Sequence, residues 1–205
     1  MLTYLQVNEG LLRGGIQGLS DENLKQQFML YKSAVQHLNS TRAQLDAMRL
    51  DGRSENVLYR DRGPGPAAEW NKVVLYELYF ENLGKADSGV FGSLGSAVKK
   101  QWDSLDEFKL EIVRLSRSHY AQWLLLGYEP YSDQLYLHQV DMRGLGLMVH
   151  HSIILCLNLF ESSYCRDFGA QGKNHYVEAL LENIDWDVCQ LRYDRAREGL
   201  LPSRP

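Results

Sequence analysis

The sequence 18-GLSDENLKQQFMLYKSAVQHLN-39 carries the clearest structural pattern in the chain. Ser20 stands before two acidic residues, and this order is typical of the first turn of a helix. The apolar residues that follow recur at spacings close to one helical turn: Leu24, Phe28, Tyr31, Val35, Leu38, Leu45 and Met48. The pattern predicts one long helix over about residues 20–50.

A second helix follows this first one after a break. Residues 51–66 end in Gly-Pro-Gly-Pro, which cannot continue a helix, so the segment predicts a loop. Apolar residues from Ala67 to about Leu83 predict the second helix, and Gly84 stands where a helix commonly ends. Two helices joined by one loop predict an antiparallel hairpin.

The second half of the chain has a different pattern, beginning beyond the glycine-rich stretch 89–95. Residues 104–121 predict a helix capped by Ser104, and strand-like runs follow over 122–126, 134–140 and 151–157. Turn residues fill 127–133 and 141–146, and two closing helices are predicted over 174–184 and 187–198. Helices first and mixed structure second indicate an α+β fold. We expect an N-terminal helical hairpin domain over 1–88 and a C-terminal α/β domain over 89–205.

Composition narrows the class of protein. The chain has 205 residues, with 22 Lys and Arg against 26 Asp and Glu, and this mild negative charge argues against a nucleic-acid partner. The longest apolar tract, 147–160, is interrupted by polar residues, so we expect no membrane span. The start of the chain does not resemble a secretory signal, and the three cysteines form no C-x-x-C pair. These features predict a cytoplasmic protein.

Local motifs for phosphate or metal binding are weak. Gly14, Gly15 and Gly18 indicate a turn before the first helix better than a phosphate loop, because no strand precedes them. His150 and His151 are neighbours, and neighbours in a strand point to opposite faces. Together with His119 they are the histidines expected near the core, more as structural residues than as ligands. A metal site that uses His119, His150 or His151 remains an alternative.

Four segments, taken in order, resemble the iron/manganese superoxide dismutase family. Residues 18–39 resemble its first-helix signature, and 75-LYELYFENLG-84 resembles the second-helix segment in which a ligand His precedes an aromatic residue. The stretch 157-LNLFESSYCRDFG-169 resembles the D-x-W/F-E-H-A pattern, and 174–194 resembles the closing helices. The resemblance implies that family's fold, in which an N-terminal antiparallel helical hairpin precedes a three-stranded antiparallel sheet with flanking helices.

The family holds its metal with three His and one Asp, and all four positions carry other residues here. By the resemblance they are Gln27 (Gln26 if the register slips by one), Tyr76, Asn158 and Ser162. Tyr31 takes the place of the family's gateway His. Iron and manganese prefer imidazole and carboxylate donors, which neutral amides, phenols and hydroxyls do not replace. We therefore expect no metal and no other cofactor, and no superoxide dismutation.

Two interpretations of these polar residues remain open. Random filling of a vacated site would favour apolar residues, because an unpaired buried polar group costs about 1–3 kcal/mol. The side chains either satisfy one another as a closed network or face a small-molecule substrate. The candidates for catalysis are Tyr76, Asn158, Gln27 and Tyr31, and those for substrate binding are Ser162, Tyr164, Phe80, Ala121 and Phe160. Ala121 and Phe160 stand where the family has Trp, and both enlarge the cavity.

Glu161 is retained, and in the family this Glu reaches across a two-fold interface. The resemblance therefore implies a homodimer with Glu161 at its interface. The first hypothesis for function is a metal-free, cofactor-independent enzyme of cyclase, isomerase or lyase type, serving a biosynthetic pathway in the former metal cavity. The alternative is a non-catalytic dimeric pseudoenzyme or scaffold.

Overall fold

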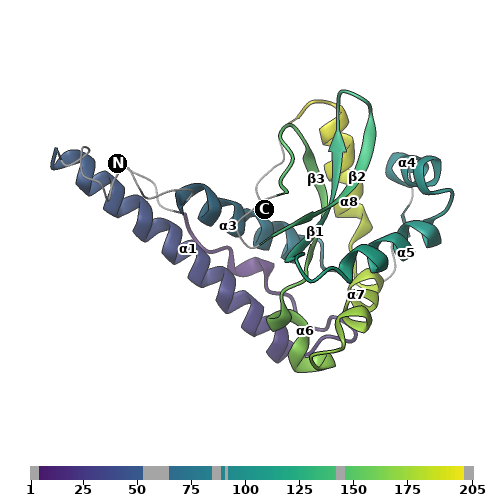
Figure 1. The fold of residues 1–205 in the computed structure, drawn as a ribbon, viewed down its shortest axis with the longest axis horizontal. Coiled ribbons are helices and arrows are strands. Elements are labelled where there is room, and N and C mark those ends of the chain that lie inside the picture. Colours follow the sequence, from purple (N-terminus) through teal and green to yellow (C-terminus); the bar gives the residue numbers. More distant parts are fainter. Residues whose placement is uncertain (1–4, 53–64, 85–88, 91, 142–145, 201–205) are drawn as a thin grey trace.

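The computed structural model describes residues 5–52, 65–84, 89–90, 92–141 and 146–200. Its first half is a helical hairpin (Figure 1). Helix α1 spans Asp21–Leu50 and helix α3 spans Gly65–Glu81, after a short 3-10 turn at Glu9–Leu11. The two helices run antiparallel, since Phe28 contacts Phe80 while Tyr31, one turn later, reaches back to Glu77. The Ser20 hydroxyl accepts a hydrogen bond from the Asn23 N–H, as the predicted cap requires.

Two boundaries in this region differ from the sequence predictions. Helix α3 begins at Gly65 rather than Ala67, because proline is tolerated in a first helical turn. The expected loop between the helices lies mostly outside the described residues. The glycine-rich stretch 89–95 is not all loop, since helix α4 spans Gly92–Trp102. A Cβ atom on Gly95 would lie 2.7 Å from the Val90 carbonyl oxygen. The absence of a side chain at Gly95 therefore lets the backbone of Val90 lie close to the first turn of α4.

A three-stranded antiparallel sheet follows helix α5 (Leu105–Ser116), in the order β2-β1-β3. Its strands are β1 (Trp123–Glu129), β2 (Gln134–Val140) and β3 (Ser152–Asn158). The prediction of a turn from Gly127 was wrong for 127–129, which continue β1. The register between β1 and β3 shifts at Leu126/Gly127, so a bulge carries the strand through the glycine. The second predicted turn lies partly outside the described residues.

The closing part is helical, as expected, with one addition. Helix α6 (Glu161–Phe168) directly follows β3, and the sequence analysis did not predict it. Helices α7 (Lys173–Glu182) and α8 (Trp186–Arg197) match the two predicted segments to within about two residues. The Asp185 side chain caps α8 by accepting a hydrogen bond from the Val188 N–H.

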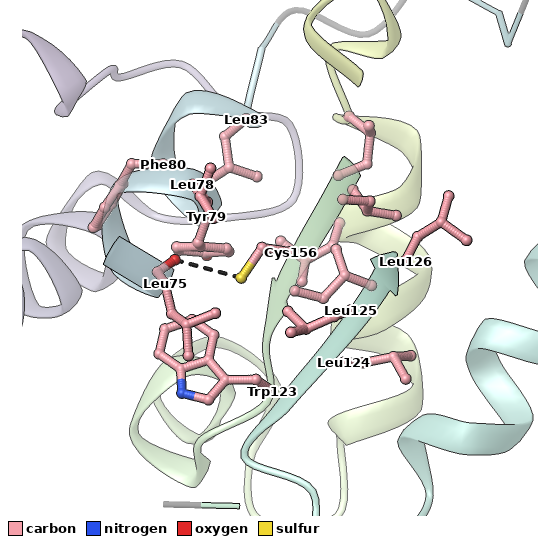
Figure 2. Close-up of a cluster of buried hydrophobic side chains, with 14 of the residues drawn as sticks. Leu75, Leu78, Tyr79, Phe80, Leu83, Trp123, Leu124, Leu125, Leu126 and Cys156 are labelled. Atoms are coloured by element: carbon pink, nitrogen blue, oxygen red, sulfur yellow. Dashed lines mark hydrogen bonds between the residues drawn. The ribbon is translucent and has the colours of Figure 1, made fainter. Parts of the chain in front are cut away.

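The sheet lies between two layers of helix. Leu75 and Tyr79 of α3 lie beside Trp123 of β1 and Cys156 of β3, whose thiol donates to the Leu75 carbonyl (Figure 2). Helix α8 covers the opposite face (Figure 1), where the rings of Tyr128 and Tyr193 meet edge to face. The α+β class, with long N-terminal helices and a three-stranded antiparallel sheet, is confirmed. The division at residue 88 stays a prediction. No helix in the described ranges has the length and apolar character needed to cross a membrane.

Candidate functional site: a buried polar network

Two side chains from distant parts of the chain meet in the centre of the molecule. Gln27 lies on α1 and Asn158 ends β3, and both are fully buried. The Asn158 Nδ2 donates to the Gln27 Oε1 at 3.2 Å, and the Asn158 Oδ1 accepts from the Phe160 backbone N–H at 3.1 Å. Gln27 in turn donates from Nε2 to the Asn23 Oδ1 at 2.8 Å. The side-chain oxygens of Asn23 and Gln27 thus accept hydrogen bonds from other side-chain amides, and that of Asn158 accepts from the backbone.

The network continues from α1 into α6. The Asn23 Nδ2 donates to the Ser163 carbonyl oxygen and to the Asp167 Oδ2, both at 2.9 Å. Gln27 adds a longer contact of 3.4 Å to the same Ser163 carbonyl. Ser163 is fully buried, whereas its neighbour Ser162 is partly exposed. The member of this pair that joins the network is therefore Ser163, and Ser162 lies at its edge.

Neither Asn23 nor Ser163 was among the residues predicted from the sequence. A signal for Asn23 existed, because it stands four residues before Gln27 and therefore on the same face of α1. Ser163 gave no comparable signal. Its place depends on helix α6, which turns the buried backbone carbonyl of Ser163 toward α1.

Tyr76 lies next to this network within an aromatic cluster. Its ring centroid is 5.1 Å from that of Trp123, edge to face, and 6.5 Å from that of Phe80, nearly stacked. Trp123 also packs against the half-buried Phe160 at 5.5 Å. Burial raises the pKa of Tyr76 to about 12, so its hydroxyl stays protonated at neutral pH. No hydrogen bond joins that hydroxyl to another residue of the described ranges.

Tyr31 belongs to a separate polar contact at the α1–α3 junction. Its hydroxyl donates to the Glu77 carboxylate at 2.8 Å and accepts from the Asn8 backbone N–H at 3.1 Å. Glu77 is only 1% exposed and was not among the sequence candidates. The ring of Tyr31 lies 6.4 Å from that of Tyr76, so the two tyrosines are neighbours with different partners.

A second tyrosine pair, Tyr79 and Tyr176, lies close to Gln27. The hydroxyls of Tyr79 and Tyr176 are 3.3 Å apart. Burial raises the pKa of both groups, and a polar contact with Gln27 opposes part of the rise at Tyr79. The Ser163 Oγ is buried without a hydrogen bond of ordinary geometry, although it lies close enough to Tyr176 to lower its pKa slightly. Tyr164 packs on Tyr176 with ring centroids 5.8 Å apart.

The remaining candidates lie around this centre. Phe80 and Ala121 are buried, Phe160 is half-buried and Glu161 is exposed on the first turn of α6. A cavity of about 440 Å³ lies elsewhere, between residues 13–16, Gly84, Asp185 and Asp187. The structure therefore brings Gln27, Asn158 and Tyr76 together with the aromatic residues, and leaves Glu161 and Ser162 toward the surface.

Comparison with known proteins places the chain in a family. The profile of the iron/manganese superoxide dismutases, C-terminal domain, matches residues 90–192. The chain belongs to the iron/manganese superoxide dismutase family.

Three relatives illustrate the distance within the family. A superoxide dismutase [Fe] of Cupriavidus metallidurans is 28% identical over 171 residues, covering 81% of this chain and 83% of the relative. A superoxide dismutase [Fe] of Aquifex aeolicus is 25% identical over 201 residues, covering 95% and 93%. A superoxide dismutase [Mn] 2 of Haloferax volcanii is 29% identical over 126 residues, covering 61% and 62%.

The family implies an iron or manganese ion, and the side chains of the buried centre do not fit one. Gln27 and Asn158 are neutral amides whose oxygens already accept hydrogen bonds. Tyr76 remains a neutral phenol. Neutral amides and a neutral phenol do not balance the positive charge of an iron or manganese ion. Within the described ranges, no group of three or more His, Cys, Asp or Glu is placed to hold an ion.

Proposed function

We propose that this chain is a family member without iron or manganese at the buried centre and without superoxide dismutase activity. The observation that carries the proposal is the direct hydrogen bond between Gln27 and Asn158, from two of the positions that the resemblance assigns to metal ligands. A metal ion there would have to break this bond and the Asn158–Phe160 contact. It would receive neutral oxygens in return, and these bind iron or manganese poorly.

The hydrogen bonds of the network hold together elements that a metal ion would otherwise connect. Through Asn23, Gln27 and Asn158 it connects α1 to the end of β3 and to α6, which are far apart in the sequence. Each amide has its donors and acceptors largely paired, so the buried polar groups stabilise one arrangement of these elements. This favours the alternative of a non-catalytic pseudoenzyme, which serves as a scaffold on the family's frame.

An activity assay tests the first part of the proposal. The chain is produced in cells supplied with iron or with manganese, and its rate of superoxide dismutation is compared with that of the Cupriavidus metallidurans enzyme prepared in the same way. We expect the chain to give only the uncatalysed rate with either metal. Metal-dependent dismutation that is lost in the Asn158→Leu variant would overturn the proposal.

One observation favours a second candidate, a cofactor-independent enzyme of cyclase, isomerase or lyase type. Tyr76 is only 2% exposed, and its hydroxyl has no hydrogen-bond partner in the described ranges. Buried hydroxyl groups normally have such a partner. Because its pKa is raised to about 12, it is a hydrogen-bond donor at neutral pH and would polarise a carbonyl oxygen of a small organic substrate.

Tyr76→Phe separates the two candidates, because it removes only the hydroxyl. The folded chain is purified without denaturation and its non-covalent small molecules are identified by native mass spectrometry. For an enzyme, a molecule copurifies with the unsubstituted chain and is lost from Tyr76→Phe, while Tyr79→Phe, a matched change in the same helix, retains it. For a scaffold, neither form carries a molecule and Tyr76→Phe folds with unchanged stability.

A further inference from the structure

A pair of histidines lies over a glycine in the sheet, away from the buried polar network. Gly127 of β1 pairs with Tyr136 of β2 and with Ile153 of β3, just after the bulge. A Cβ atom on Gly127 would lie 3.1 Å from the His138 Cε1 and 3.4 Å from the His151 Cδ2. The two imidazole rings, one from each side of β1, therefore share the space that a side chain at Gly127 would fill.

Each ring has one buried nitrogen without a hydrogen-bond partner. The His151 Nδ1 lies 3.2 Å from the Val149 carbonyl oxygen, which can only accept, so Nδ1 carries the proton. The Nε2 of His151 is then a free lone pair, and it is buried with no hydrogen-bond partner. The His138 Nδ1 is also buried without a hydrogen bond of ordinary geometry. Both unpaired nitrogens are bonded directly to the ring carbons that meet above Gly127.

The arrangement has the chemistry of a metal-ligand pair. A ligating histidine commonly donates its other ring N–H to a backbone carbonyl, as His151 does to Val149. Two imidazoles on one tetrahedral ion have ring centroids about 5 Å apart. The centroids of His138 and His151 are 6.2 Å apart, so the two rings would have to approach each other by about an ångström to share one ion.

The charges around the pair also suit a cation. Burial lowers the pKa of His138, the backbone of Tyr136 opposes this, and the neighbouring His151 lowers it further. A lowered pKa at His138 reduces the competition that a metal ion meets from a proton. The Glu129 carboxylate, on the same strand as Gly127, lies near His151 and adds negative charge beside the pair.

We propose that His138 and His151 form a binding site for a divalent late transition-metal ion such as Zn²⁺. Imidazole nitrogens are preferred ligands of Zn²⁺, Cu²⁺ and Ni²⁺. Because no third His, Cys, Asp or Glu joins them within the described ranges, water molecules complete the coordination. The site is independent of the former metal centre. It also corrects the expectation for the histidines, since His119 and His150 are exposed and His138 was overlooked.

Calorimetric titration with ZnCl₂ tests the site. We expect saturable binding of one ion per chain near pH 7.5, at least about tenfold weaker in His138→Gln and in His151→Gln, and lost in the double variant. His119→Gln changes an exposed histidine and should bind as the unsubstituted chain does. Equal weakening by His119→Gln, or undiminished binding in the double variant, would overturn the proposal.

A second measurement needs no substitution. Cu²⁺ added to the unsubstituted chain should give an electron paramagnetic resonance spectrum with hyperfine structure from two imidazole nitrogens. Acidification to about pH 5 should abolish it, because both nitrogens must be unprotonated to bind. A spectrum without nitrogen coupling at neutral pH contradicts a two-histidine site even if the variants fail to fold.

Discussion

At the scale of single residues, the decisive feature is that Gln27 and Asn158 satisfy each other. A buried amide that loses its partner costs about 1–3 kcal/mol, whereas removing both partners together is often much less harmful. The network therefore predicts strong coupling between the two side chains. Uncharged polar residues are tolerated at the centre of the molecule because they are hydrogen-bonded to one another, whereas an unpaired polar group there would be destabilising.

A double-mutant cycle tests this coupling. We expect Gln27→Leu and Asn158→Leu each to lower the free energy of unfolding by about 1–3 kcal/mol, and the double variant to lose clearly less than the sum. Denaturant unfolding measured by circular dichroism supplies the four values. If the two losses are simply additive, the side chains do not act as a pair.

The histidine pair gives a pH dependence of stability. Burial lowers the pKa of His138, so the unfolded chain takes up this proton at a higher pH than the folded chain. The stability that depends on the neutral ring is complete above the unfolded pKa of about 6.5 and is lost as the pH falls through that value toward the folded pKa.

Replacing the ring removes this contribution. With a chelator present, His138→Gln should lose less free energy of unfolding than the unsubstituted chain between about pH 7.5 and pH 5. His119→Gln, which changes an exposed ring, should follow the unsubstituted chain. Parallel curves for His138→Gln and the unsubstituted chain would show that His138 titrates alike in both states.

At the scale of elements, the start of α1 is held by α6. The Asp167 Oδ2 accepts from the Ser20 backbone N–H at 2.9 Å, and the Oδ1 accepts from the Ser20 hydroxyl at 2.7 Å. Burial alone would raise the pKa of Asp167, but the hydrogen bonds from Ser20 and Asn23 outweigh it and lower the pKa. The negative charge also suits the N-terminal end of α1.

Asp167→Asn keeps the shape and removes this charge. We expect a lower free energy of unfolding than in the unsubstituted chain at neutral pH. The difference should shrink as the pH falls below about 4, because a carboxylate with a lowered folded pKa stabilises above its unfolded pKa and loses that effect on protonation. Thermal unfolding of both forms over this range measures it, and a difference independent of pH would assign the effect to packing.

The sequence predicted some elements well because their signals are local. The Ser20 cap and the apolar spacing defined α1, and the predicted range 187–198 placed the start of α8 to within a residue. Helix α6 and the continuation of β1 through Gly127 depend on tertiary packing and a bulge, which leave no local pattern. Gln27, Asn158 and Tyr76 were found through the family resemblance. Asn23 could have been found from its place one turn before Gln27, whereas Ser163 and Glu77 needed the three-dimensional contacts.

At the scale of the whole molecule, the exposed Glu161 on α6 is consistent with the proposed homodimer, whose interface the resemblance places there. Glu161→Arg should shift the chain from dimer toward monomer in sedimentation experiments, whereas Glu178→Arg, an exposed change on α7, should not. A monomeric unsubstituted chain at micromolar concentration would contradict the proposal of a homodimer, and a dimer unaffected by Glu161→Arg would place the interface elsewhere.

The buried centre is proposed to hold neither iron nor manganese. Equilibrium dialysis against iron or manganese tests this directly. Every protein tested also carries His138→Gln and His151→Gln, so that only binding at the buried centre is measured. The positive control adds Gln27→His, Tyr76→His, Asn158→Asp and Ser162→His, which restore the family's donor types. We expect far less than one iron or manganese ion per chain without these four changes. Retention of about one ion per chain, lost in Gln27→Leu/Asn158→Leu, would contradict this expectation.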